Sequence, residues 1–187
     1  MLRNISTWLY CFSRGWVALA ALAIFLLFGA LVLPGQAAAA RVYSAAAGSP
    51  DTSLFYSPSD LLRMAESYGE SGRQAYVRAR FTFDLAFPLV FTFFLASANS
   101  WLLSRALPAA SRWRLLNLIP LGGMLFDYLE NISAALVIGR YPASTPLLAA
   151  FAPVFTLLKW AFVGGSFALL CTAAILYVIQ NIQKKNG

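Results

Sequence analysis

Histidine is absent from this chain of 187 residues, and charged residues make up only 11% of it. The absence of His excludes His-based catalysis, haem ligation through His and almost every common zinc site. The two Cys residues are too few for a disulfide framework. Since soluble domains average about 25% charged residues, the composition nearly excludes a water-soluble globular enzyme. We expect no metal and no cofactor, and no motif identifies a catalytic residue.

Hydrophobic residues are correspondingly abundant, at 60% of the chain, and the mean hydropathy is +0.68. A helix needs roughly 20 apolar residues to cross a hydrocarbon core about 30 Å thick. Four stretches meet this requirement, at about 16–38, 82–103, 115–138 and 149–180. The backbone must satisfy its own hydrogen bonds inside a bilayer, so each stretch is predicted to be a helix. The sequence therefore predicts an all-α integral membrane protein, a four-transmembrane-helix bundle forming a single membrane domain.

The first apolar stretch also has features of a signal peptide. Arg3 and Arg14 precede it, and the small residues at 37–40 fit an A-x-A cleavage site. Its apolar run is nevertheless longer than the roughly 7–15 residues of a typical signal peptide. We predict a retained anchor, with cleavage as the alternative.

The formal net charge of +7 is explained by membrane topology. The segments 1–15, 104–114 and 181–187 carry basic residues and no acid. Under the positive-inside rule, this distribution predicts that both termini are cytoplasmic. We favour the bacterial cytoplasmic (inner) membrane as the location. No basic face with interleaved aromatic residues is present, so nucleic acid is not an expected partner.

The predicted outside loop, 39–81, is too long for a simple link between two spans. The small and polar segment 38–53 is expected to be mobile. The second part of the loop is predicted to be partly helical and has two interpretations. It is either a lid over the mouth of the bundle that presents Arg73 to an anionic group, or an interfacial helix lying on the lipid headgroups, which its amphipathic pattern favours.

Helix signals within this second part are specific. Ser57 is a favourable N-cap, and Pro58 suits the first position of a helix. Gly69 and Gly72 are predicted to bracket a break, after which the chain runs into the second span.

Charged residues inside the predicted spans are the strongest functional signal. A charge in the bilayer costs at least about 2.5–3.5 kcal/mol on insertion scales, so it is expected to face the bundle interior and to mark a site. Such residues are Asp84, Asp127, Glu130 and Lys159, and Asn131 adjoins Glu130. Positions 127, 130 and 131 are three and four residues apart, so they share one helix face.

The depths of these residues also converge. At about 1.5 Å per residue, Glu130 and Lys159 both lie about 12–15 Å from the outer boundary, and we predict that they pair. Asp84 is nearer the outer mouth and Asp127 is near the midplane. The polar groups are thus predicted to occupy the outer half of the bundle.

Three buried acids facing one base are electrostatically unfavourable. One remedy is a carboxyl that keeps its proton, for which Asp127 is the candidate. A second is an Arg from the outside loop, namely Arg73, Arg78 or Arg80, that folds into the bundle. A third is the binding of a cation or a basic ligand.

Small residues continue the polar face of the third span. Pro120, Gly123 and Ala134 would let another helix approach closely. Pro120 is also expected to free a backbone carbonyl and kink the helix.

These observations support three hypotheses of function. In the first, the protein binds a lipid or a small charged ligand at Asp127, Glu130, Asn131 and Lys159, with Asp84 and Arg73 at the mouth. In the second, a carboxyl acts as acid or base in an integral-membrane enzyme with a lipidic substrate. In the third, the protein is an accessory or assembly subunit whose polar groups meet a membrane-protein partner. A homo-oligomer is compatible with each, and buried polar groups that only fix helix register are the alternative to all three.

Overall fold

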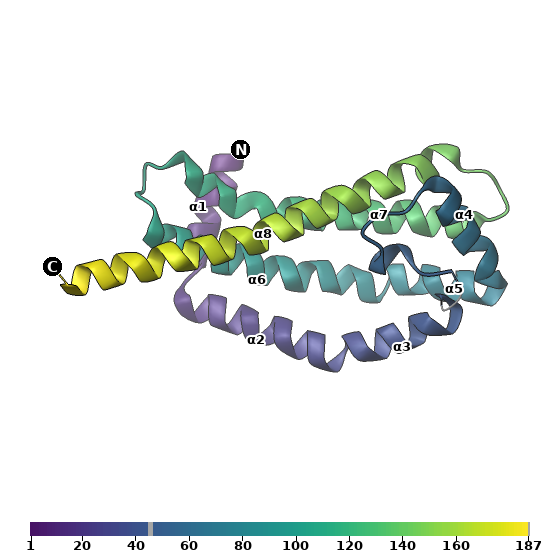
Figure 1. Ribbon diagram of the computed structural model, residues 1–187, viewed down its shortest axis with the longest axis horizontal. Helices are drawn as coiled ribbons and strands as arrows, with labels where there is room; N and C mark the ends of the chain where they lie inside the picture. The colour runs from purple at the N-terminus through teal and green to yellow at the C-terminus, as the bar shows by residue number, and fades with distance from the viewer. Residues whose placement is uncertain (45–46, 187) are drawn as a thin grey trace.

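The computed structural model describes residues 1–44 and 47–186, and all regular structure in this part of the chain is helical. Four stretches are long and apolar enough to cross a membrane: Gly15–Ser44, Gly69–Ala106, Arg112–Arg140 and Pro146–Lys185. They run along the long axis of the molecule, as Figure 1 shows. The predicted all-helical fold with four candidate spans is therefore confirmed.

The first candidate span consists of two helices, α2 (Gly15–Leu31) and α3 (Leu33–Ser44), joined at Val32. Helix α3 corrects the first part of the expectation that segment 38–53 is mobile, because the helix continues to residue 44, whereas residues 45–46 lie outside the described residues. The Ala-rich composition of this stretch favours a helix intrinsically. Tyr43 then anchors its end, since its ring lies 5.0 Å from the ring of Tyr68, measured between centroids.

Three short helices close one end of the bundle, which we call the cap end. They are η1 (Pro50–Thr52), α4 (Pro58–Ser67) and α5 (Gly69–Arg80). The prediction that Ser57 caps α4 is confirmed, because its hydroxyl accepts a hydrogen bond from the backbone N–H of Asp60 at 3.1 Å. Asp60 accepts in return from the backbone N–H of Ser57 at 2.9 Å, which completes a capping box.

The two glycines of this region have different roles. Gly69 has a φ of +63° and separates α4 from α5, as predicted. Gly72 was wrongly predicted to mark a break, because it lies inside α5. A Cβ atom at Gly72 would come within 2.8 Å of the Cβ of Tyr43. Its lack of a side chain therefore lets α3 and α5 approach each other.

The remaining spans are α6 (Phe83–Ala106), η2 (Arg112–Leu118) continued by α7 (Ile119–Arg140), and α8 (Pro146–Asn186). Pro120 was wrongly expected to kink the third span. It lies in the first turn of α7, where a missing N–H breaks no helical hydrogen bond. The prolines inside helices are instead Pro88 in α6 and Pro153 in α8.

Helices α7 and α8 form the most extensive contact in the bundle. Gly123 lies so close to α8 that a Cβ there would be 3.0 Å from a methyl carbon of Val163. Ala134 is fully buried. The prediction that small residues on this face admit a neighbouring helix is confirmed, and the close packing fixes the register of the polar residues on α7 against α8.

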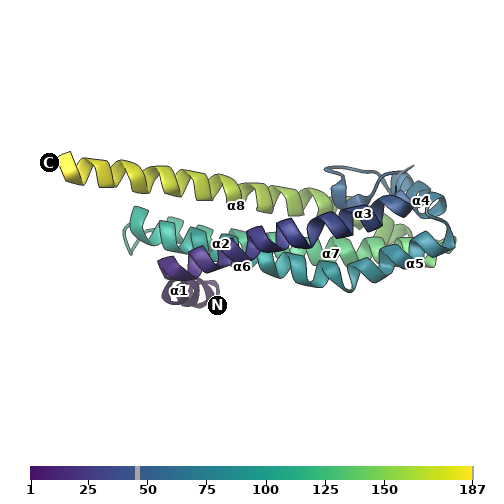
Figure 2. The same ribbon diagram turned by 90° about the horizontal axis from the view of Figure 1, so that it is seen from below.

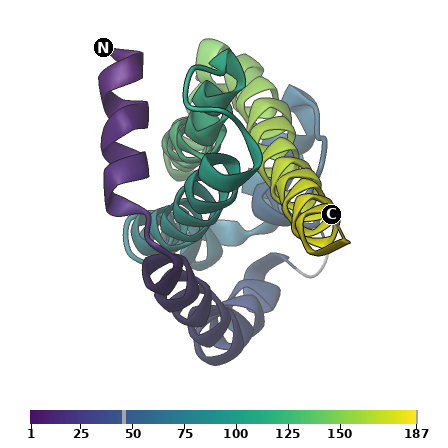
Figure 3. The same ribbon diagram turned by 90° about the vertical axis from the view of Figure 1, so that its left-hand side faces the viewer.

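Helix α1 (Leu2–Phe12) marks the opposite end, which we call the α1 end. It lies across the long axis, as Figures 2 and 3 show. Asn117 accepts a hydrogen bond from the hydroxyl of Ser6 at 2.8 Å and donates one to the hydroxyl of Ser100 at 3.0 Å. The hydroxyl of Tyr10 donates to the carbonyl of Arg114 at 2.6 Å, and burial raises the pKa of Tyr10 to about 12. These contacts hold α1 against α6 and η2.

Candidate functional site

An ion pair between α7 and α8 forms the centre of the candidate site. Lys159 of α8 pairs with Glu130 of α7, which confirms the pairing predicted from their common depth. The Nζ of Lys159 also lies 3.6 Å from Oδ1 of Asp127. Lys159 is only 7% exposed and Glu130 is 0% exposed. The lysine is therefore held between two carboxylates away from bulk solvent.

The spacing on α7 brings its polar residues together as expected. Asn131 donates a hydrogen bond from Nδ2 to Oδ1 of Asp127 at 3.5 Å, one helical turn away. Both side chains are buried. Asp127, Glu130 and Asn131 thus form one polar face directed at α8.

A second buried cation enters from the cap end. Arg80, at the last position of α5, lies 2.8 Å from Asp84 of α6, measured from Nε to Oδ2, and also pairs with Asp51 of η1. Its guanidinium stands over the ring of Tyr76 at 4.5 Å from the ring centroid. Arg80 is 6% exposed. Of the three arginines considered from sequence, Arg80 is the one that folds into the bundle.

Asp51 is a member of the site that sequence reasoning missed. It belonged to a stretch expected to be mobile, so no spacing connected it with the spans. The hydroxyl of Ser49 donates a hydrogen bond to its Oδ2 at 2.8 Å. The indole N–H of Trp160 donates to the carbonyl of Ser53 at 3.2 Å. This bond ties the loop around η1 to α8, next to Lys159.

The charges of this cluster do not cancel. Apart from the exposed Arg63–Asp60 pair, the ion pairs found in the described part of the chain join four carboxyl groups to two cationic groups. The carboxyl groups are Asp51, Asp84, Asp127 and Glu130, and the cations are Arg80 and Lys159. The cluster therefore carries an excess of two negative charges when every group is ionised.

A cavity of about 820 Å³ adjoins the cluster. Its polar side is lined by Arg80, Asp84, Asp127, Asn131 and Lys159. Its apolar side is lined by Phe25 and Leu33 of the first span, Phe87 and Phe91 of α6, and Val163 and Phe167 of α8. Glu130 does not line the cavity, so it acts on it only through Lys159. The polar side of the cavity, which we call the cavity floor, thus adjoins a largely apolar space.

The walls of this cavity come from different candidate membrane helices. Helices α2 and α3 form one wall, and α8 forms another. Figure 3 shows α2 and α3 set apart from α8. The cavity therefore lies between candidate membrane helices rather than within the cap alone.

Aromatic residues of the cap end are buried near Glu130. The hydroxyl of Thr156 donates a hydrogen bond to the Tyr56 hydroxyl at 3.1 Å, and both residues are buried. Burial, and then the negative charge of Glu130, raise the pKa of Tyr56. Tyr76 is also fully buried. Tyr56 and Tyr76 belong to the core that joins α4, α5, α7 and α8.

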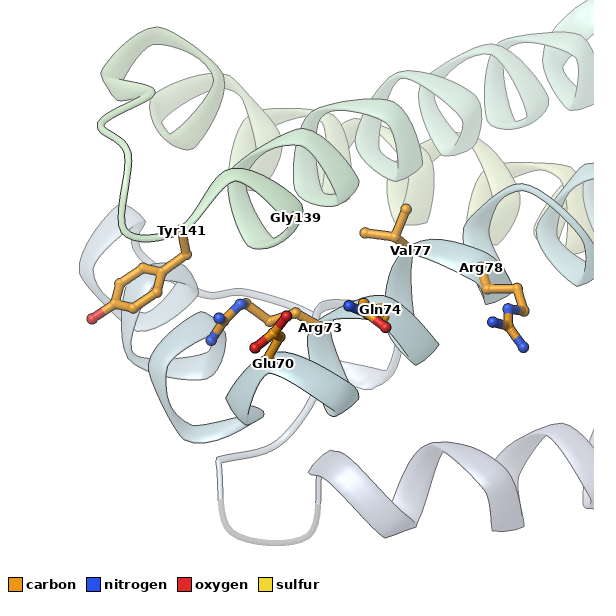
Figure 4. Close-up of a pocket in the computed structure, with 7 residues that line it drawn as sticks. All are labelled: Glu70, Arg73, Gln74, Val77, Arg78, Gly139 and Tyr141. Atoms are coloured by element: carbon orange, nitrogen blue, oxygen red, sulfur yellow. The ribbon is translucent and has the colours of Figure 1, made fainter.

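Arg73 is not brought together with the other predicted site residues. It lines a separate pocket of about 540 Å³ on the surface, between α5 and the end of α7. Figure 4 shows Arg73 beside Glu70 and near Tyr141, whose ring centroid is 5.4 Å from its guanidinium carbon. Its Nη1 donates to the carbonyl of Ala65 at 3.2 Å. Arg73 precedes Arg80 by two helical turns, about 10 Å along α5, so it lies nearer the tip of the cap.

Comparisons with models of protein families, with curated proteins and with solved structures found no match to the chain. The function must therefore be inferred from the chemistry of the site itself, which is a buried, acid-rich cluster beside an apolar cavity in a bundle of four candidate membrane helices.

Proposed function

We propose that this small polytopic membrane protein binds a lipid-like ligand with a charged head, in the half of the bundle that carries the cap. The observation that carries the proposal is the cavity of about 820 Å³. Ligand pockets typically measure about 300–1,000 Å³ and combine mainly apolar walls with a few convergent polar groups. The cavity has both features, because Asp84, Asp127 and Lys159 lie beside aromatic and aliphatic side chains.

The position of the charges supports binding over a purely structural role. A charge within a membrane is expensive, and removing one partner of a buried ion pair leaves the other uncompensated. Helices α7 and α8 are already in register through Gly123 and Ala134, without any need for charge. A cluster that also lines a cavity is better explained by a ligand.

The proposed orientation places both termini in the cytoplasm of a bacterial cell, with the cap end outside the cytoplasmic membrane. The basic segments 1–15, 104–114 and 181–187 support this orientation. The α1 end, which carries η2, would then be cytoplasmic. Exposed Trp8, Trp16 and Trp113 at that end suit the membrane interface, where aromatic residues are enriched.

The test is to purify the full chain in mild detergent and to identify the co-purifying lipids and proteins by mass spectrometry. We expect one lipid class to be enriched over its share in the host membrane. Ala40 lines the cavity from α3, so Ala40→Trp should fill part of it and reduce the bound lipid. The matched control is Ala20→Trp, since Ala20 is an exposed residue of α2.

Two results would contradict the proposal. Equal lipid retention in both Trp variants would show that the lipid is not in the cavity. A stoichiometric protein partner without an enriched lipid would favour the accessory-subunit hypothesis instead.

An enzyme that acts on a lipidic substrate is a second candidate. It is favoured by Asp127, which lines the cavity 3.6 Å from the amine of Lys159, an arrangement suited to a carboxyl acid or base. Incubation of the purified chain with the enriched lipid distinguishes the two roles, since an enzyme converts the lipid and a binding protein returns it unchanged.

A further inference from the structure

The charge of the cavity floor indicates the chemistry of the head that it would accept. Each buried cation is already engaged, because Arg80 contacts Asp84 and Asp51, and Lys159 pairs with Glu130. An anionic head placed beside Asp84 and Asp127 would add to the negative excess of the ion-paired cluster. A cationic head would reduce it, and at low dielectric such a difference is large.

Two carboxylates of the floor retain capacity for a ligand. Asp84 receives Arg80 at Oδ2, and Asp127 receives Asn131 at Oδ1. Oδ1 of Asp84 and Oδ2 of Asp127 take no part in these contacts. Both residues line the cavity, so an ammonium group there would find two acceptors with negative charge.

Other residues that line the cavity suit the remaining parts of a lipid with a cationic head, namely its phosphate and its acyl chains. Phe83, Phe87 and Trp160 bring aromatic rings to the cavity beside the carboxylates, and aromatic faces attract ammonium groups. Arg41 and Arg78 also line the cavity, and both are exposed. They provide positive charge for a phosphate next to the ammonium. The apolar side chains around Phe91 and Phe167 would hold an acyl chain.

We propose that the ligand is a zwitterionic phospholipid whose ammonium group binds at Asp84 and Asp127 and whose phosphate lies near Arg41 and Arg78. This inference rests on the proposed function, because it assumes that the cavity holds a lipid. It goes further by naming the charge of the head and the residues that recognise it.

The experiment uses the full chain in detergent with equal amounts of dioleoyl phosphatidylethanolamine and dioleoyl phosphatidylglycerol, and counts bound molecules by native mass spectrometry. We expect the ethanolamine lipid to bind about tenfold more tightly, since close charge pairs at interfaces contribute at least that much. In Asp127→Asn this preference should fall several-fold. Glu66→Gln is the matched control, because it removes one negative charge from an exposed position of α4 outside the cavity and should leave the preference unchanged.

Different outcomes test the charge of the lipid head and the binding of a lipid separately. Equal or tighter binding of phosphatidylglycerol to the unmodified chain would overturn the inference about the head and leave lipid binding in place. Failure of both lipids to bind would overturn the proposed function itself. Since the comparison of the two lipids needs no variant, it remains decisive if Asp127→Asn does not fold.

Free ethanolamine supplies the last arm of the experiment. We expect it not to displace the lipid at the concentrations used, because it lacks the acyl chains that contact the apolar wall. Displacement by ethanolamine alone would overturn the lipid source and assign the site to a soluble amine.

Discussion

The two ends of the bundle both bury polar side chains, but they satisfy them differently. At the α1 end, Asn117 meets Ser6 and Ser100 through hydrogen bonds between neutral groups. At the cap end, the buried groups are acidic and basic side chains paired around Lys159 and Arg80, and they adjoin a cavity of about 820 Å³. The α1 end is held by hydrogen bonds between neutral groups, whereas the cap end has an excess of acidic side chains beside a cavity.

This difference distinguishes buried polar side chains that stabilise the fold from those that serve a function. A hydrogen-bonded Asn fixes helix register at a modest cost, and it needs no cavity beside it. Buried carboxylates in excess over their cationic partners cost far more and are retained in membranes mainly at functional sites. We infer that the α1 end stabilises the fold and that the cap end carries the function.

The largest effect is expected when the ion pairs of Lys159 at the cap end are removed. Lys159→Met leaves Glu130 and Asp127 without their shared cation, so we expect a loss of about 3–5 kcal/mol in the free energy of unfolding, as for other broken buried pairs. Thermal unfolding in detergent measures it. The double variant with Glu130→Gln should recover part of the loss, because it removes one uncompensated acid.

Lys184→Met is the control for this change, since Lys184 is exposed near the end of α8. It should unfold like the unmodified chain. If Lys159→Met were as stable as Lys184→Met, the cluster would not be the charged centre described above.

The second prediction concerns the hydrogen bonds of Asn117 at the α1 end. Asn117→Ala removes the partner of Ser6 and Ser100, and buried groups left unsatisfied cost about 1–3 kcal/mol. We expect lower stability but unchanged lipid binding, because Asn117 does not line the cavity. Asn4→Ala, at an exposed position of α1, is the matched control. Loss of lipid binding at unchanged stability would reverse the roles assigned to the two ends.

The third prediction sharpens the comparison by moving α3, one wall of the cavity. Gly72→Ala would force a Cβ against Tyr43, and overpacking typically costs about 1–3 kcal/mol, partly offset by the better helix propensity of Ala. We expect slightly lower stability and clearly weaker lipid binding. Gly164→Ala, where a Cβ meets nothing within 4 Å, should stabilise α8 slightly and leave binding unchanged. Equal binding in both variants would argue against α3 as a wall.

The smallest effect concerns pH and the cap on α4. Hydrogen bonds from Ser57 lower the pKa of Asp60 below its ordinary value of 3.8. A lowered pKa contributes stability that is present above the unfolded value and is lost as pH falls through the folded value. Asp60→Asn should therefore be slightly less stable than the unmodified chain at pH 7, and the difference should shrink below about pH 4. A difference that persisted at pH 2 would contradict this origin.

Part of the site could be predicted because it depends on local geometry. Asp127, Glu130 and Asn131 share a face by helical spacing alone, and depth along the helices matched Glu130 with Lys159. Arg80 could be named only as one of three arginines. Its selection over Arg73 depends on where α5 ends and α6 begins, and Asp51 depends on the course of a loop without a periodic pattern.

The sequence by itself determined the helical fold class, since four apolar stretches of sufficient length with scarce charge predict helices able to cross a membrane. It also determined the cap on α4 and the level at which the charges meet. The tertiary structure decided the helical course of residues 33–44, the close contact at Gly72 and the cavity beside the acids. The reason is physical: spacing along one helix is fixed by the backbone, whereas the gap between two helices depends on the side chains of both.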